Sequence, residues 1–349
     1  MPAPSRDPLA GRLPVTLVTG FLGSGKTTLV SRLVRHPEMN RVAVVINEIG
    51  EIGIDHDLVA LSTENIALLA NGCICCSVRT DLQETLRDLF ARRRAGEVAD
   101  FDRVIIETTG LADPAPVVQT LLADNLVSAH FRLDGLVTLV DAVNGARQLA
   151  EHPEPAKQIA LADRMFVTKG DIASAEAVAD LRDAIAQINP GAQVRLVLHG
   201  EVEPSALTGL GLASARAGEA TLRFLGEPLQ GAGSAGDKHL GARPPLHDGS
   251  IRTLSLYFDT PFTWNGFSAA LELLATLRGP DLLRVKGIVN VEGAPVVVQG
   301  VQHIFHPPVT LDRWPGEDTR TRLVFITRRI EAAVIRDLLQ AVARVAAAG

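Results

Sequence analysis

The chain has 349 residues, with 34 lysines and arginines against 40 aspartates and glutamates and a formal net charge of -6. This length is enough for two domains that each bury a core. The charge balance provides no broad basic surface for a nucleic-acid backbone, and no apolar run is long enough to span a membrane. We therefore expect a cytoplasmic protein without nucleic-acid or membrane partners.

A phosphate-binding loop follows the first predicted strand. Gly20–Thr27 reads GFLGSGKT and matches G-x-x-x-x-G-K-[ST] at every fixed position, between the apolar run Val15–Val18 and the apolar-periodic segment Leu29–Val34. Glycines let the N–H groups of such a loop turn inward, and the helix dipole adds positive charge, so the loop binds anions. The candidate nucleotide-binding residues of this loop are Gly23, Ser24, Gly25, Lys26, Thr27 and Thr28.

Two side chains of this loop and one beyond it are candidates for catalysis. Lys26 can reach the β- and γ-phosphates, and the Thr27 hydroxyl can coordinate Mg²⁺. The predicted buried strand Val104–Ile106 ends in Glu107, a position where P-loop enzymes hold Mg²⁺ or orient water. Gly110 follows and can approach the γ-phosphate closely. We expect Lys26, Thr27 and Glu107 to be catalytic, with Thr27 and Glu107 at Mg²⁺.

A guanine-binding motif follows another predicted strand, Met165–Val167. The segment reads Thr168-Lys169-Gly170-Asp171, with Thr168 in the place of the usual asparagine. A carboxylate there can accept hydrogen bonds from N1–H and from the exocyclic amine of guanine, and adenine offers no matching donor pair. We predict that Thr168, Lys169 and Asp171 bind the base and select GTP.

The three cysteines, Cys73, Cys75 and Cys76, lie within four positions and cannot join distant parts of the chain by disulfides. We expect them in a loop before a helix that begins near Thr80, where the helix dipole favours thiolates. Such thiolates suit Zn²⁺, Co²⁺ or Cu⁺, with Glu51, a water or a partner's ligand completing the shell. Inert buried thiols and a redox switch are the two other interpretations.

Repeated strand and helix signals predict the fold of the first part of the chain. Val42–Ile46 reads as a buried strand, and Asn47–Glu51 follows at the edge of the sheet where ligands bind. The alternation continues through the predicted strand Gly135–Asp141, the helix Ala175–Ile188 and the strand Val194–Leu198. Such βα units imply an α/β fold with a doubly wound, mostly parallel sheet.

The last hundred residues predict a small α+β domain with an antiparallel sheet. Strands are expected over Ile251–Phe258, within Leu282–Phe305 with a turn at Glu292-Gly293, and over Leu323–Ile326. The apolar residues that mark two amphipathic helices are Trp264, Phe267, Leu271 and Leu274, then Ile330, Val334, Leu338 and Val342. His303 and His306 are three apart on a predicted strand and so face opposite sides, which favours structural histidines over a shared metal.

With these motifs in this order, the chain resembles the CobW-type family of P-loop GTPases, which includes metallochaperones and is related to HypB and UreG. The matching segments are Gly20–Thr28, Asn47–Glu51, Gly72–Cys76, Glu107–Pro114 and Thr168–Asp171. Beyond the linker the chain resembles the CobW C-terminal domain, through Arg284–Gly287, Gln299–His303 and the stretch at Trp314. The resemblance implies GTP hydrolysis tied to delivery of a transition metal, with the cysteine motif as the metal site.

The expected domains are a disordered lead-in at 1–14, a P-loop GTPase domain at 15–225, a flexible linker at 226–249 and a CobW C-terminal domain at 250–349. We expect slow Mg²⁺-dependent GTP hydrolysis and Zn²⁺ or Co²⁺ as cargo. Expected partners are a client metalloprotein or an enzyme of a metal-cofactor pathway, with homodimer formation left open. Two alternatives are a metal-responsive GTP-binding switch without metal transfer and an ATP-dependent kinase with a redox cysteine loop.

Overall fold

The computed structural model describes residues 11–47, 59–63, 66–69, 74–77, 82–211 and 250–348. The predicted lead-in up to residue 10 and the predicted linker 226–249 lie outside the described residues. Contacts between residues divide the chain into two compact units. Each unit consists of segments that are separated from one another in the sequence. The first unit consists of Met1–Asn144, Ala162–Val178 and Val194–Ala213, and the second of Gly145–Leu161, Ala179–Gln193 and Ser214–Gly349.

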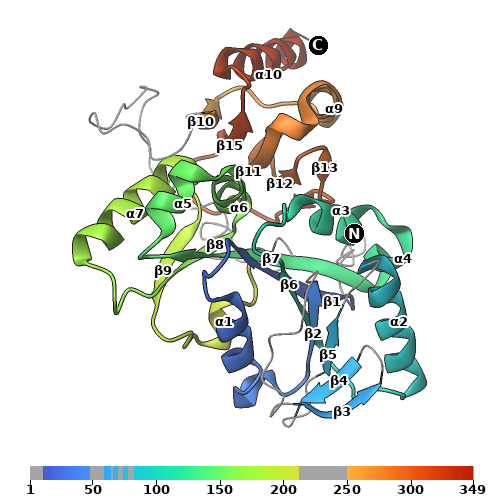
Figure 1. The fold of residues 1–349 in the computed structure, drawn as a ribbon. Helices are drawn as coiled ribbons and strands as arrows, with labels where there is room; N and C mark the ends of the chain where they lie inside the picture. Colours follow the sequence, from blue (N-terminus) through green and yellow to red (C-terminus); the bar gives the residue numbers. More distant parts are fainter. Residues whose placement is uncertain are drawn as a thin grey trace. The chain divides into compact units, whose positions relative to one another are not determined.

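The first unit is built on a nine-stranded sheet in the order β3-β4-β5-β2-β6-β1-β7-β8-β9 (Figure 1). The strands from β5 to β8 in this order pair in parallel. β3 and β4, and β4 and β5, pair antiparallel. The strands are β1 (Leu13–Gly20), β2 (Val42–Asn47), β3 (Val59–Thr63), β4 (Ile66–Leu69), β5 (Ile74–Ser77), β6 (Arg103–Thr108), β7 (Phe131–Asp141), β8 (Arg164–Thr168) and β9 (Gln193–Val197).

Helices flank this sheet and close its core. The elements of the first unit are α1 (Lys26–Leu33), α2 (Leu82–Ala95), α3 (Ala115–Ala123) and α4 (Asn125–His130), with short 3-10 turns at η1 (Pro37–Met39) and η3 (Pro204–Ala206). α7 (Ala175–Ile188) begins in the first unit and continues in the second. Val18, Leu29 and Ile105 are fully buried in one core cluster with Phe166 and Leu207. The near-continuous apolar runs of the strands fit parallel strands that are covered on both faces.

The cysteine prediction needs a correction. Cys75 and Cys76 lie in β5 and not in a loop, with Cα partners Val44 and Val45 on β2. β5 is paired on both sides, in parallel with β2 and antiparallel with β4, and this pairing of backbone groups decides the local structure. Cys73 lies outside the described residues.

The second unit contains a six-stranded antiparallel sheet in the order β10-β15-β11-β12-β13, with β14 paired to β12. Its strands are β10 (Ile251–Phe258), β11 (Leu282–Val291), β12 (Ala294–Val301), β13 (Ile304–Phe305), β14 (Val309–Thr310) and β15 (Thr321–Arg328). Its helices are α5 (Gly145–Glu151), α6 (Pro153–Leu161), most of α7, α9 (Trp264–Arg278) and α10 (Ala332–Ala348), with a 3-10 turn at η6 (Gly279–Asp281). Glu292 and Gly293 have φ angles of 52° and 93°, as a tight hairpin turn between β11 and β12 requires.

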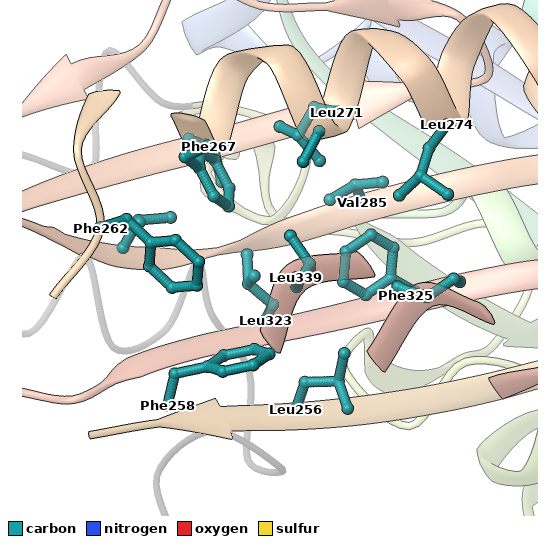
Figure 2. Close-up of a cluster of buried hydrophobic side chains, with 14 of the residues drawn as sticks. Leu256, Phe258, Phe262, Phe267, Leu271, Leu274, Val285, Leu323, Phe325 and Leu339 are labelled. Atoms are coloured by element: carbon teal, nitrogen blue, oxygen red, sulfur yellow. The ribbon is translucent and has the colours of Figure 1, made fainter. Parts of the chain in front are cut away.

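Apolar side chains from both helices and the sheet form the core of this C-terminal sheet. Figure 2 shows Phe267, Leu271 and Leu274 of α9 pointing toward Phe325 of β15 and Leu339 of α10. The aromatic rings of Phe258, Phe262 and Phe267 pack edge to face, with centroids 5.3 and 5.4 Å apart. The predicted fold class, a mostly parallel α/β sheet followed by an antiparallel α+β domain, is confirmed. None of the helices in the described ranges is long and apolar enough to cross a membrane.

Candidate nucleotide site

The loop between β1 and α1 has backbone angles that call for its glycines. Gly23 and Gly25 have φ angles of 74° and 91°, in the region that side chains rarely adopt. A Cβ atom on Gly20 would lie 2.4 Å from the carbonyl oxygen of Leu139, so a larger residue does not fit. The spacing of the glycines in the motif therefore matches the backbone conformation that the chain adopts here.

The side chains of this loop supply one positive charge, from Lys26, and three hydroxyl groups, from Ser24, Thr27 and Thr28. Lys26 is 6% exposed, and its Nζ donates hydrogen bonds to the carbonyl oxygens of Gly20 at 2.9 Å and Phe21 at 3.3 Å. Ser24 Oγ is buried and has no hydrogen-bond partner among the described residues. Thr28 lies on the exposed side of α1. The Lys26 ammonium group, together with a Ser24 hydroxyl that has no partner in the described part of the chain, lies in a glycine loop at the start of a helix and fits a phosphate group.

Thr27 and Glu107 meet next to the loop. Thr27 Oγ1 donates a hydrogen bond of 2.7 Å to Glu107 Oε1. Glu107 is fully buried on β6, where it pairs with Val18 of β1. A hydroxyl beside a carboxylate is an oxygen donor set of the kind that Mg²⁺ prefers. The two residues that the sequence predicts at Mg²⁺ are therefore in direct contact.

Gly110 lies against the backbone of the phosphate-binding loop. A Cβ atom on Gly110 would lie 2.7 Å from the backbone nitrogen of Leu22 and 2.9 Å from its Cα. The hydroxyl of Thr108 donates to the hydroxyl of Thr19 at 2.8 Å and joins the ends of β6 and β1. The segment after β6 and the loop after β1 are thus held together by contacts that leave no room for a side chain at Gly110.

The predicted guanine-binding motif is tied to the same loop. Thr168 Oγ1 donates a hydrogen bond of 2.8 Å to the carbonyl oxygen of Ser24. Lys169 has a φ angle of 58°, and its Nζ lies 2.7 Å from Asp141 Oδ2. The threonine that replaces the usual asparagine therefore links the end of β8 to the loop after β1.

Asp141 is a candidate site residue that the sequence prediction missed. It ends β7, is 1% exposed, and accepts hydrogen bonds at Oδ1 from the backbone of Val143 and Asn144 at 2.8 and 3.2 Å. Burial raises the pKa of Asp141, but hydrogen bonds from Lys169, the Asn144 side chain and these two backbone groups outweigh it and leave the pKa below its usual value. The available signal was an acidic residue at the end of an apolar strand, the same signal that indicated Glu107.

A second missed segment is the turn after β9. His199 Nδ1 lies 3.9 Å from Asp171 Oδ2; the His199 side chain is exposed and the Asp171 side chain is partly exposed. His199 and Gly200 both have positive φ angles, 52° and 75°. A Cβ atom on Gly200 would lie 3.2 Å from Cγ2 of Thr28 on α1. This turn therefore lies beside both the helix of the phosphate-binding loop and the predicted base-binding carboxylate.

The predicted transition-metal ligands are only partly covered. Glu51 and Cys73 lie outside the described residues, and for Cys75 and Cys76 only the backbone position on β5 is described. Within the described ranges no group of three or more His, Cys, Asp or Glu side chains is placed to hold a metal ion.

His306 and His303 have separate surroundings. His306 is buried, with its Nε2 3.5 Å from Nε2 of Gln299. The Cβ of His303 lies against Gly279.

Comparison with known proteins gives two family matches that cover most of the chain. Residues 14–195 match the CobW/HypB/UreG nucleotide-binding domain, and residues 251–343 match the cobalamin synthesis protein cobW C-terminal domain. The zinc chaperone YjiA of Escherichia coli strain K12 is 33% identical over 330 residues, covering 92% of this chain and 96% of that protein. The zinc chaperone CobW of Pseudomonas aeruginosa is 34% identical over 372 residues, covering 94% of this chain and 91% of that protein.

A solved structure supports the same relationship. The crystal structure of Zn(II)-bound YjiA GTPase from E. coli has a TM-score of 0.73 and 30% sequence identity, and the alignment covers 95% of this chain and 99% of that chain. The family model, the relatives and the structure agree with the resemblance that the motifs indicated. The chain belongs to the CobW/HypB/UreG family of nucleotide-binding proteins and carries the cobW C-terminal domain.

Proposed function

We propose that this protein is a GTP-hydrolysing metallochaperone that binds zinc or cobalt and delivers it to a client metalloprotein or to an enzyme of a metal-cofactor pathway. The observation that carries the enzymatic half is the contact of Thr27 with Glu107 at 2.7 Å, beside the Lys26 ammonium in the glycine loop. The chain is a GTPase of the family to which it belongs. Its relatives are named zinc chaperones, which supports a metallochaperone role.

The nucleotide is held at both ends. The phosphates bind to Gly23, Ser24, Gly25, Lys26, Thr27 and Thr28, with Gly110 beside the loop. The guanine base binds to Lys169 and Asp171, while Thr168 fixes their strand to the loop through Ser24. Asp141 holds the Lys169 ammonium in place at 2.7 Å.

Hydrolysis of GTP uses the side chains around the phosphates. Lys26 stabilises the negative charge that develops on the transferred phosphoryl group. Thr27 and Glu107 would supply the oxygen atoms that hold Mg²⁺, and this ion, when bound, would neutralise negative charge on the phosphates. We expect the intrinsic rate to be slow, because the matched loop contains no arginine to stabilise the transition state.

The transition metal binds at Cys73, Cys75 and Cys76, with Glu51 as a fourth ligand. Adjacent residues of a regular strand lie on opposite faces, so one ion can contact both Cys75 and Cys76 only if β5 departs from regular strand geometry there. Support comes from the backbone register of the sheet. Cys76 pairs with Val45, and the next row joins Ser77 of β5 to Ile46 of β2 and Glu107 of β6. The strand of the cysteines thus lies two strands, or about 10 Å, from the strand of the proposed Mg²⁺ carboxylate.

The proposed domains are a lead-in at 1–14, a GTPase domain at 15–225, a linker at 226–249 and a C-terminal domain at 250–349 that provides a surface for the client. We place the protein in the cytoplasm, where reduced thiols are available for metal binding.

The test is metal analysis of the purified protein under reducing conditions, with and without Mg²⁺ and GTP, followed by timed transfer of the metal to an apo-metalloprotein during one GTP turnover. We expect bound zinc or cobalt that leaves the protein as GTP is hydrolysed. If the metal stays bound through hydrolysis while a partner's affinity changes, the protein is a metal-responsive switch and does not transfer its metal. If it lacks bound metal and hydrolyses ATP as well as GTP, the metallochaperone assignment is wrong.

A further inference from the structure

The segment with the candidate guanine-binding residues starts and ends at helices of the second unit. Ala162–Val178 belongs to the first unit, whereas Gly145–Leu161 before it and Ala179–Gln193 after it belong to the second. The segment contains β8 and Thr168–Asp171. Its two covalent attachments are therefore α6 and the main part of α7, which group with the C-terminal sheet.

The C-terminal end of α6 is held by side chains of this second unit. The last carbonyl groups of a helix have no partner within the helix and need donors from elsewhere. Arg284 of β11 donates through Nη1 to the carbonyl oxygen of Leu161, the last residue of α6. Asn189 Nδ2 donates to the carbonyl oxygens of Ile159 at 2.9 Å and Ala160 at 3.4 Å. Arg284 is 4% exposed, so its charge meets the negative end of the helix dipole out of water.

The C-terminal end of α7 is held in the same way by β10, another strand of the C-terminal sheet. Thr253 Oγ1 of β10 donates a hydrogen bond of 2.8 Å to the carbonyl oxygen of Ile188, the last residue of α7. One strand of the C-terminal sheet thus holds the helix before the guanine-binding segment, and another strand holds the helix after it.

We propose that Arg284 and Thr253 are positioning residues through which the C-terminal sheet sets the affinity for guanine nucleotides. The inference rests on the proposed function, because it requires Lys169 and Asp171 to bind guanine. β8 begins three residues after Leu161 and pairs with β7 from Arg164 to Thr168. A shift of the end of α6 is therefore passed along a short paired strand to the contacts of Thr168 with Ser24 and of Lys169 with Asp141.

This arrangement gives the C-terminal sheet a regulatory role. A protein partner that binds this sheet and changes either cap changes the affinity for GTP and GDP. By linkage, the nucleotide then changes the affinity for that partner by the same factor.

The test measures dissociation of a fluorescent GDP analogue from the full-length protein. Arg284→Ala should accelerate dissociation within the range of about 5–150-fold that is typical of coupled sites, and Thr253→Val should act in the same direction with a smaller effect. Arg284→Lys, which keeps a donor, should restore part of the slow dissociation rate.

The saturated rate of GTP hydrolysis should change much less than the dissociation rate, because none of these variants touches Lys26, Thr27 or Glu107. Arg252→Ala is the control, because Arg252 lies next to Thr253 on β10 and its exposed side chain lies 3.7 Å from the exposed carboxylate of Glu331.

A double-mutant cycle separates positioning from general stability. In an Asp171→Ala background the contact with the base is already lost, so Arg284→Ala should add little to the dissociation rate, whereas a purely structural effect would add in full. If Arg284→Ala does not fold, Thr253→Val decides. A wild-type protein that fails to bind the GDP analogue overturns the proposed function. Binding by the wild type with unchanged dissociation from Thr253→Val and Arg284→Lys, and from Arg284→Ala where it folds, overturns the positioning role alone.

Discussion

The hydroxyl of Thr27 donates a hydrogen bond of 2.7 Å to the fully buried carboxylate of Glu107, across 80 residues of sequence. This contact predicts the effect of Glu107→Gln, which keeps the size and the acceptor oxygen but removes the charge. We expect Mg²⁺ affinity in the GTP complex to fall by about 10–100-fold, with a matching loss of hydrolysis at limiting Mg²⁺. A Mg²⁺ titration of GTP hydrolysis measures this, with Glu151→Gln as a control at an exposed carboxylate paired with Arg147. An unchanged Mg²⁺ requirement would remove Glu107 from the metal site.

Lys26→Ala should abolish turnover. The Lys26 ammonium is held inside the loop by the carbonyl oxygens of Gly20 and Phe21, where it can turn to the phosphates. We expect wild-type turnover of about 10⁻⁴ to 10⁻³ s⁻¹ without a partner and no measurable turnover in the variant. Single-turnover hydrolysis measures this, and Arg32→Ala serves as the control because Arg32 lies on the same helix in an exposed ion pair with Glu201. Persistent hydrolysis by Lys26→Ala would place catalysis elsewhere.

Asp171→Asn should change the preferred base. The amide replaces an acceptor with a donor, so GTP should bind more weakly and xanthosine triphosphate more tightly. Loss of a charged hydrogen bond that is covered by the bound base costs about 2–5 kcal/mol. Competition titrations with GTP, xanthosine triphosphate and ATP measure the change. Equal affinity of the wild-type protein for GTP and ATP would contradict the assignment of the base site.

Asp141 should make stability depend on acid pH. Its pKa is lowered below the usual value of 3.8, so its carboxylate contributes stability that is fully present above about pH 4 and is lost as pH falls through the lower folded pKa. Asp141→Asn should be less stable at neutral pH and should lose less stability on acidification than the wild type. Denaturant unfolding from about pH 7 to pH 3 gives the two slopes. Parallel slopes would show that Asp141 does not provide this dependence.

The parts of the site that the sequence predicted are those with chemistry at a fixed spacing. The loop from Gly20 to Thr27 requires its glycines and its lysine at set positions, and an acid at the end of an apolar strand indicated Glu107. Contacts between distant segments could not be predicted in this way. Asp141 meets Lys169 across 28 residues, and Arg284 meets Leu161 across 123 residues, because strand order and helix ends bring them together.

The cysteine motif shows the same limit at the level of local structure. Its position just before a predicted helix favoured a loop, but pairing with β2 and β4 places Cys75 and Cys76 in a strand. Local preference is weak for short segments, and pairing with neighbouring strands overrides it.

Metal affinity should depend on the bound nucleotide, through the sheet row that joins Ser77 of β5 to Ile46 of β2 and Glu107 of β6. Asn47 ends β2, and the Asn47–Glu51 motif contains the proposed ligand Glu51. If this segment responds to γ-phosphate and Mg²⁺ as switch segments of GTPases do, the cysteines and Glu51 converge in the GTP state. A coupling of about 1–3 kcal/mol, or 5–150-fold, is enough to load metal with GTP and release it after hydrolysis.

The measurement of this coupling is a zinc titration of the protein bound to GDP and to a non-hydrolysable GTP analogue, repeated with Cys75→Ser and Cys76→Ser. We expect tighter zinc binding with the GTP analogue, and weak binding in both nucleotide states for the serine variants, because a hydroxyl is a poor substitute for a thiolate ligand of zinc. Linkage requires zinc to raise the affinity for the GTP analogue by the same factor, which a nucleotide titration checks independently. Equal zinc affinities in the two nucleotide states would contradict nucleotide-driven release. Unchanged zinc affinity in the serine variants would instead contradict the cysteine site, because zinc would then bind through other ligands. The coupling to the nucleotide could still hold for those ligands.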